Sequence, residues 1–183
     1  MTSRSSASTE TVLFSAEDIE RTLKRLAHEI VEANSGSKNL VIVGILSRGK
    51  PLGERIAALI SDMEQQAVPQ GYVDITLYRD DTRKTLKPVQ GSDIPVDITG
   101  RDVVLVDDVL YSGRTIRAAL DALKDYGRPN TIQLAVLLDR GHRQLPISPD
   151  FVGKRIETLP NQRVNVRLKE LDHTEAVTLQ SDP

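Results

Sequence analysis

The chain has 183 residues, of which 39% are hydrophobic and 27% charged, and its formal net charge is −2. These values predict one globular domain with a sizeable aliphatic core, and they do not favour a general nucleic-acid-binding protein, which is usually basic overall. The absence of Cys excludes disulfides and thiolate chemistry and agrees with a cytoplasmic location, and no apolar run is long enough to span a membrane.

The chain begins with a Ser/Thr-rich stretch, MTSRSSASTE, which lacks the apolar segment of a signal peptide. We expect a disordered tail over residues 1–12 and a single domain over residues 13–180. Ser15 and Asp18 have the spacing of a capping box, and Phe14 and Ile19 that of a hydrophobic staple. Apolar residues then recur at helical spacing, so a helix should run to about residues 34–36.

The rest of the chain alternates between predicted strands and helices. Residues 40–46 (LVIVGIL) and 103–106 (VVLV) are continuous apolar runs, typical of strands covered on both faces. Further strands are expected over residues 73–78 and 131–138, and short alternating segments over residues 151–179. One helix should follow the turn at residues 47–50 and end near Met63, and a second should cover residues 115–126.

This alternation predicts an α/β fold with a mainly parallel, twisted sheet flanked by helices. Residues 79–96 are charged, contain Gly and two Pro, and have no clear period. We expect them to form mostly a long mobile loop.

Three polar clusters follow predicted strands, namely Ser47–Lys50, Asp107–Thr115 and Asp139–His142. Because ligands of open α/β sheets bind outside the carboxyl ends of the strands, we expect these clusters to converge on one crevice. Asp107 and Asp108 should point to opposite sides if the strand continues through them. Such a pair can hold a cation, accept hydrogen bonds from sugar hydroxyls, or act as acid and base.

The turn Ser112-Gly113-Arg114-Thr115 opens a helix and offers hydroxyls, free N–H groups and a helix dipole to an anion. A paired Asp alone is more often a solvated turn, such a turn alone is more often an ordinary helix start, and a single His142 is more often a surface residue. Placed between a buried strand and an amphipathic helix, the carboxylates and the turn together favour a phosphosugar site. Ser47-Arg48-Gly49 is a second potential anion nest.

These motifs resemble a known family. VVLVDDVLYSGRT (103–115) is similar to the phosphoribosyl pyrophosphate (PRPP) motif of type I phosphoribosyltransferases. More narrowly, residues 25–34, 75–81, 93–100 and 127–147 resemble the PyrR family of bifunctional pyrimidine-operon regulators and uracil phosphoribosyltransferases. The likeness covers about residues 13–172.

The resemblance implies that uracil and PRPP give UMP and pyrophosphate with Mg²⁺, which PRPP and water would mostly hold. Asp107 and Asp108 would bind the ribose hydroxyls, and one of them would support the charge that develops at the anomeric carbon. The other implied ligands of the substrates are Ser47, Arg48, Arg79, Val109, Leu110, Tyr111, Ser112, Gly113, Arg114, Thr115 and Arg140. Arg79 would act as a hood segment closes, and Arg140 would flank the uracil.

The resemblance also implies homodimers or larger homo-oligomers, and binding to an mRNA hairpin that UMP or UTP strengthens. The predicted RNA ligands are Lys24, Arg25 and His28 on the first helix, extended by His142, Arg143 and Lys154. Two places depart from the family pattern: Ser148 stands where Arg is usual, and RIETLPNQ (155–162) replaces a Pro-Thr-Ser stretch. An RNA regulator that only senses nucleotides, and a transferase for another base, remain as alternatives.

Overall fold

The computed structural model describes residues 9–80 and 89–181. Within these residues the chain forms two sheets, one of five strands in the order β3-β2-β4-β5-β6 and one of three strands in the order β1-β8-β7. The strands are β1 (Thr9–Phe14), β2 (Leu40–Ile45), β3 (Gln70–Val73), β4 (Asp102–Leu110), β5 (Thr131–Asp139), β6 (Phe151–Arg155), β7 (Gln162–Arg167) and β8 (Ala176–Ser181). The helices are α1 (Ala16–Ala33), α2 (Gly49–Glu64), α3 (Arg114–Leu123) and α4 (Lys169–Asp172), with 3₁₀ turns η1 (Thr76–Tyr78) and η2 (Lys124–Tyr126).

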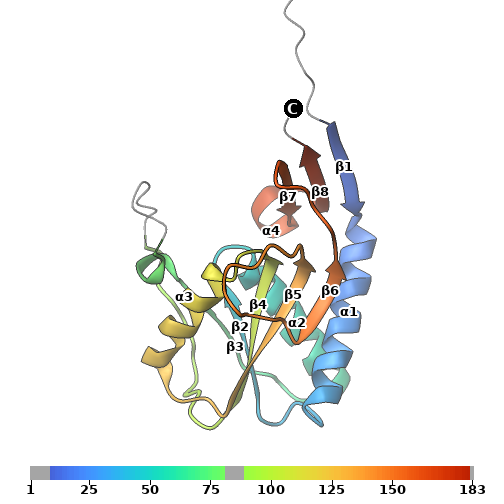
Figure 1. Cartoon of the computed structure of the whole chain (residues 1–183). Helices are drawn as coiled ribbons and strands as arrows, with labels where there is room; N and C mark the ends of the chain where they lie inside the picture. Colours follow the sequence, from blue (N-terminus) through green and yellow to red (C-terminus); the bar gives the residue numbers. More distant parts are fainter. Residues whose placement is uncertain (1–8, 81–88, 182–183) are drawn as a thin grey trace, which may run out of the picture.

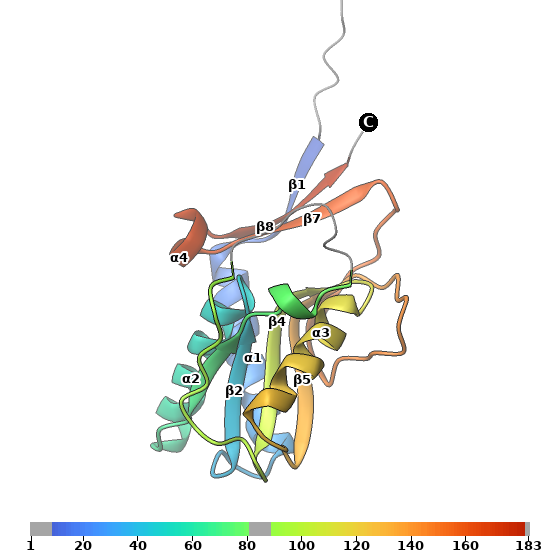
Figure 2. The same cartoon turned by 90° about the vertical axis from the view of Figure 1, so that its left-hand side faces the viewer.

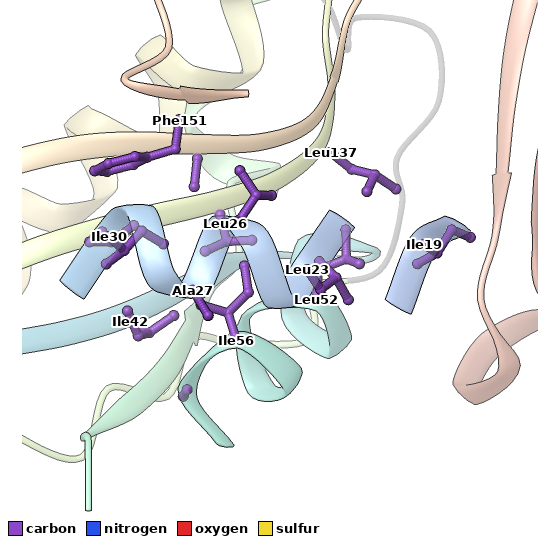
Figure 3. Close-up of a cluster of buried hydrophobic side chains, with 14 of the residues drawn as sticks. Ile19, Leu23, Leu26, Ala27, Ile30, Ile42, Leu52, Ile56, Leu137 and Phe151 are labelled. Atoms are coloured by element: carbon purple, nitrogen blue, oxygen red, sulfur yellow. The ribbon is translucent and has the colours of Figure 1, made fainter. Parts of the chain in front are cut away.

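The five-stranded sheet is entirely parallel, as expected, and helices cover both of its faces (Figure 1). Along β2, Leu40 and Ile42 face the helices α1 and α2, whereas Val41 and Val43 face α3, because successive side chains of a strand alternate between the faces. Figure 3 shows the first face, where Leu23, Leu26 and Ile30 of α1 meet α2 and the sheet. Each face of the sheet therefore has its own aliphatic core.

The predicted start of α1 is confirmed. The Ser15 side chain accepts a hydrogen bond from the Asp18 N–H, and the Asp18 side chain accepts one from the Ser15 N–H, which completes the capping box. Phe14 and Ile19 are both buried in the same core. Local sequence chemistry therefore determines where this helix begins.

The small antiparallel sheet lies over the carboxyl ends of the parallel strands (Figure 2). Its edge strand β1 covers Thr9–Phe14, so the expectation of a disordered tail is wrong for residues 9–12, while residues 1–8 lie outside the described residues. Thr11 pairs with Leu179, almost at the other end of the chain. This long-range pairing forms a strand that local sequence did not indicate.

The strand expected over residues 73–78 is also wrong beyond Val73, where β3 ends. The buried Asp74 carboxylate accepts hydrogen bonds from the backbone N–H and the hydroxyl of Thr76, and from the N–H of Gln90 and of Gly91. These bonds turn the chain into η1. The central part of the predicted loop, residues 81–88, lies outside the described residues.

Candidate active site

Strand β4, the central strand of the five-stranded sheet, carries the two adjacent carboxylates of the predicted site. It continues to Leu110, so Asp107 and Asp108 point to opposite sides and line two different cavities of about 370 Å³ each. β4 lies beside β2, where the strand order reverses direction along the chain, and such a switch point is where open α/β sheets bind ligands. The position of the acidic pair therefore agrees with the sequence prediction.

The cavity on the Asp107 side is formed mostly by the predicted anion-binding turn. Its lining consists of Arg79, Asp107, Val109, Leu110, Tyr111, Ser112, Gly113, Arg114, Thr115, Ile116 and Gln144. The turn is held to the segment that follows β5, because the Ser112 carbonyl accepts hydrogen bonds from the backbone N–H groups of Gln144 (3.0 Å) and Leu145 (3.1 Å). Gln144 was not foreseen, since nothing in its sequence context distinguishes it from a surface residue.

Gly113 precedes the first residue of α3 and has a φ of 92°, a left-handed conformation that side chains disfavour. A Cβ at this position would lie 3.3–3.4 Å from Ile147 and Leu145. The Gly therefore lets the chain enter α3 with the free N–H groups of the first helical turn at the cavity. A helix start of this kind attracts phosphate.

The Asp107 side chain is buried, with 6% of its surface exposed. Burial, and then the negative charge of Asp108, raise the pKa of Asp107 well above its ordinary value, while the Arg79 guanidinium acts in the opposite direction. One carboxylate oxygen of Asp107 accepts a hydrogen bond from the Asp108 N–H (2.9 Å), and Asp108 accepts one from the Val109 N–H (2.8 Å). The ionised pair is thus costly without a cationic or hydrogen-bonding ligand.

The second cavity lies on the Asp108 side and contains the predicted pyrophosphate residue Arg48. Its other lining residues come from the small sheet and α4: Val164, Asn165, Val166, Arg167 and Asp172. Arg48 donates to the Val166 carbonyl (2.5 Å) and to both carboxylate oxygens of Asp172 (3.0 and 3.2 Å). The alternation in residues 164–168 indicated a strand but not its position over this site.

The turn that carries Arg48 packs tightly on β4. A Cβ on Gly49 would lie 2.3 Å from the Val106 carbonyl oxygen, so only Gly permits this approach. Ser47 is exposed next to it, and the peptide bond between Leu46 and Ser47 is cis. The first predicted cluster therefore lies against the strand that carries the acidic pair.

The third cluster also converges on the site. The Arg140 N–H donates to the Leu110 carbonyl (3.1 Å), and its guanidinium lies 4.4 Å from the centroid of the Tyr111 ring. Arg143 forms an ion pair with Asp139 (2.7 Å) and donates to the Tyr111 carbonyl (3.0 Å). All three clusters therefore lie at the carboxyl ends of the parallel strands, but the expectation of one shared crevice is wrong, because Asp107 and Arg48 line separate cavities.

The chain next to Arg79, which lines the first cavity, is tied to α3. Asp80 accepts hydrogen bonds from the guanidinium groups of Arg114 and Arg117, each at 2.9 Å. The Tyr78 hydroxyl donates to Asp125. The start of the loop predicted over residues 79–96 therefore lies against α3, the helix that begins at the anion-binding turn.

The predicted RNA ligands fall into two places. On α1, Lys24 pairs with Glu20 (2.6 Å), Arg25 pairs with Glu29 (2.5 Å), and His28 contacts the Lys24 carbonyl (2.7 Å). Arg25 also donates to the carbonyls of Val152 and Gly153, which anchors α1 to β6.

Lys154 lies over the Phe14 ring, near the start of α1. His142 and Arg143 instead lie beside Tyr111, at the carboxyl end of β5. The structure thus groups these two residues with the candidate active site rather than with the basic residues of α1.

Within residues 9–80 and 89–181, no three His, Asp or Glu side chains gather closely enough to hold a metal ion. At the site, β4 offers a metal ion two carboxylates, Asp107 and Asp108, on opposite sides of the strand. In the same part of the chain, none of the helices is long and apolar enough to cross a membrane.

Comparisons with known proteins agree with this site. A model of the phosphoribosyl transferase domain family matches residues 11–173. The bifunctional protein PyrR of Chloroflexus aurantiacus is 57% identical over 172 residues, which cover 93% of this chain and 94% of that protein. The bifunctional protein PyrR of Deinococcus radiodurans is 52% identical over 169 residues, covering 91% and 92% of the two chains.

Among solved structures, a hypoxanthine phosphoribosyltransferase from Staphylococcus aureus has a TM-score of 0.69 at 24% identity, covering 94% of this chain and 93% of that one. One from Trypanosoma cruzi has a TM-score of 0.71 at 20% identity, covering 94% and 97%. These two similarities establish the fold alone. The fold, the PRPP-like motif at the switch point and the identity to the PyrR relatives together show that this chain belongs to the phosphoribosyl transferase domain family and, within it, to the PyrR family.

Proposed function

We propose that this protein transfers the phosphoribosyl group of PRPP to uracil and, with uridine nucleotide bound, regulates pyrimidine biosynthesis genes by binding their mRNA. One observation carries the catalytic part: two adjacent carboxylates, the buried Asp107 and the half-buried Asp108, line two cavities at the switch point, and an anion-binding turn follows the same strand. A ribose 5-phosphate that also carries a pyrophosphate needs this combination of acceptors and donors.

In this proposal the 5-phosphate lies at the turn of residues 112–115, where N–H groups and hydroxyls donate to it. The ribose hydroxyls donate to Asp107 and Asp108, and the pyrophosphate lies on the side of Ser47 and Arg48. The reaction breaks the bond between the anomeric carbon and pyrophosphate and forms one to uracil, whose ring N–H proton is released. Positive charge develops at the anomeric carbon, and ionised carboxylates in a buried site stabilise it.

Mg²⁺ fits this site as an ion carried mostly by PRPP oxygens and water, since Mg²⁺ retains water and favours phosphate oxygens. When bound, it neutralises charge on the departing pyrophosphate. Two arginines of the chain would contact the charge of the substrate: Arg48 in the Asp108 cavity and Arg79 in the Asp107 cavity. The Asp107–Asp108 pair offers at most two carboxylates to the ion.

Uracil would lie toward Tyr111 and the backbone of Val109 and Leu110, with Arg140 beside them. Because uracil is neutral, backbone donors and acceptors can carry much of its recognition. A direct test mixes protein, PRPP and Mg²⁺ with radiolabelled uracil or with radiolabelled hypoxanthine and measures the nucleotide formed. Formation of UMP is expected, and product from hypoxanthine without product from uracil would refute the uracil reading.

The regulatory part of the proposal is supported by the similarity to bifunctional PyrR proteins. Lys24 and His28 expose basic groups on α1 and are proposed to contact RNA phosphates, with Lys154 near the start of the same helix. Homo-oligomers and a cytoplasmic location belong to the same proposal. If the protein does not bind the hairpin in the presence of UMP, the regulatory role is contradicted. If it binds the hairpin but forms no UMP from uracil and PRPP, it is a regulator that only senses nucleotides.

A further inference from the structure

The segment between β6 and β7, residues 156–161, lies against the carboxyl end of β5. The Ile156 N–H donates to the Asp139 carbonyl (2.9 Å), which starts the segment directly beside Arg140. Thr158, in the middle, is buried with 9% of its surface exposed. The segment lies within residues 155–162, where the sequence was expected to depart from the PyrR family pattern, and the proposed function leaves it without a role.

Thr158 contacts two side chains of the candidate active site. Its hydroxyl oxygen accepts a hydrogen bond from Arg140 Nε (3.2 Å), and its carbonyl oxygen lies 2.8 Å from His142 Nε2. Arg140 Nη2 donates to the carbonyl of Gln162 (3.0 Å), the first residue of β7. Two bonds along one edge of the guanidinium thus set the plane in which it lies.

The face of that guanidinium rests on Tyr111. The Arg140 side chain lies 4.4 Å from the Tyr111 ring centroid, and the His142 ring lies 5.8 Å from it. Tyr111 lines the Asp107 cavity and is 44% exposed, so the groups that flank its ring do much to hold it. A cation over an aromatic face is attracted only within about 6 Å of the ring centroid, so the orientation of Arg140 matters to Tyr111.

We infer that Thr158 is a positioning residue for base binding, which acts by holding Arg140 over Tyr111 at the edge of the Asp107 cavity. The inference rests on the proposed function, because it concerns the end of the cavity that would receive uracil. Thr158 contacts no part of the phosphate turn or of the Arg48 cavity in the described structure. Its effect is therefore confined to the base and does not extend to PRPP.

The test compares Thr158→Val, which keeps the shape of the side chain but removes the acceptor, with Thr158→Ser, which keeps the acceptor. For the Val variant, KM for uracil should rise roughly three- to ten-fold, the effect of losing about one net hydrogen bond. Its KM for PRPP and its kcat should stay within about two-fold, and the Ser variant should behave like the wild type in all three constants.

Thermal unfolding separates this role from a merely structural one, because general destabilisation would lower Tm and disturb both KM values together. Thr158→Ala provides a second test if the buried Val variant folds poorly. An unchanged KM for uracil in a folded Val or Ala variant would overturn the inference, as would an equal rise in both KM values. If the wild type makes no UMP, the proposed function itself fails, whereas UMP formation with unchanged variants refutes only the role of Thr158.

Discussion

Replacing Asp107 with Asn is expected to stabilise the fold at neutral pH while removing most of the activity. The side chain is buried, and the loss of hydration together with the nearby Asp108 charge raises the pKa of Asp107. Asn has the same shape and retains an oxygen that can accept the hydrogen bond from the Asp108 N–H. The substitution therefore removes the charge and leaves the local geometry in place.

The size of the effect follows from proton linkage. Because the pKa is raised in the folded state, the stability associated with this group is fully present below the unfolded pKa and is lost as pH rises toward the folded pKa. Over that window the wild type loses about 1.4 kcal/mol of unfolding free energy per pH unit relative to the Asn variant. For a domain of this size, this corresponds to roughly 3–6 °C in Tm per pH unit.

The measurement is thermal unfolding without ligand at a series of pH values from acid to slightly alkaline. The two proteins should have similar Tm values at acid pH, and the Asn variant should gain an increasing advantage as pH rises. With PRPP and uracil at neutral pH, turnover of the same variant should fall by roughly 10²–10³-fold, as expected when a group that stabilises developing charge is lost. Parallel curves of Tm against pH, or wild-type turnover, would refute the reasoning.

Asp102 on the same strand provides a matched control. Hydrogen bonds from the side chains of Asn39 and Asn130 lower the pKa of Asp102, so its contribution to stability is present above the unfolded pKa and is lost as pH falls. Asp102→Asn should therefore lower Tm at neutral pH, the opposite sign to Asp107→Asn. Its turnover should stay close to that of the wild type, because Asp102 lies at the other end of β4.

Three further predictions concern the turns and the surface. Gly113→Ala should lower the unfolding free energy by about 1–2 kcal/mol, since Ala is strained at a positive φ, and raise KM for PRPP; unchanged values of both would contradict its assigned place in the anion-binding turn. Arg48→Ala should raise KM for PRPP by about ten-fold or more, because a charge-assisted contact to phosphate is lost. Steady-state kinetics measures KM for both substrates, and a larger rise in KM for uracil than in KM for PRPP would contradict this role. The double variant Lys24→Ala, His28→Ala should bind the hairpin more weakly and with less salt dependence, at an unchanged Tm. Arg25→Ala should weaken hairpin binding and also lower Tm, because Arg25 anchors α1 to β6. Unchanged hairpin affinity in the double variant would show that α1 is not part of the RNA-binding surface.

Most of the parallel sheet could be predicted from the sequence. The runs at residues 40–46 and 103–106 are apolar throughout because both faces of their strands are covered, and continuous apolar runs are a direct consequence of that burial. The start of α1 was predictable for a different reason, since its cap is formed by side chains within three residues of each other. Both are local signals that need no knowledge of the rest of the chain.

The errors arose where distant parts of the chain decide the conformation. Polar and apolar residues alternate over Val73–Tyr78 as in a strand. The Asp74 carboxylate, however, accepts hydrogen bonds from the N–H groups of residues 90 and 91, and β3 ends at Val73. Residues 9–12 have a polar composition typical of a tail, yet they pair with β8 near the carboxyl terminus. A partner more than a hundred residues away leaves no mark in the local pattern.

The sequence by itself determined the chemistry of the site: an acidic pair directly after an apolar strand run, an anion-binding turn before a helix, and three polar clusters at the edge of one parallel sheet. Parallel strands bring their carboxyl ends together, so this convergence follows from the fold class alone. Only the tertiary structure decided that Asp107 and Asp108 line separate cavities, that Asp172 holds Arg48, and that Thr158 holds Arg140. These relations depend on packing the small sheet and its connections over the strand ends, which joins residues that no sequence period relates.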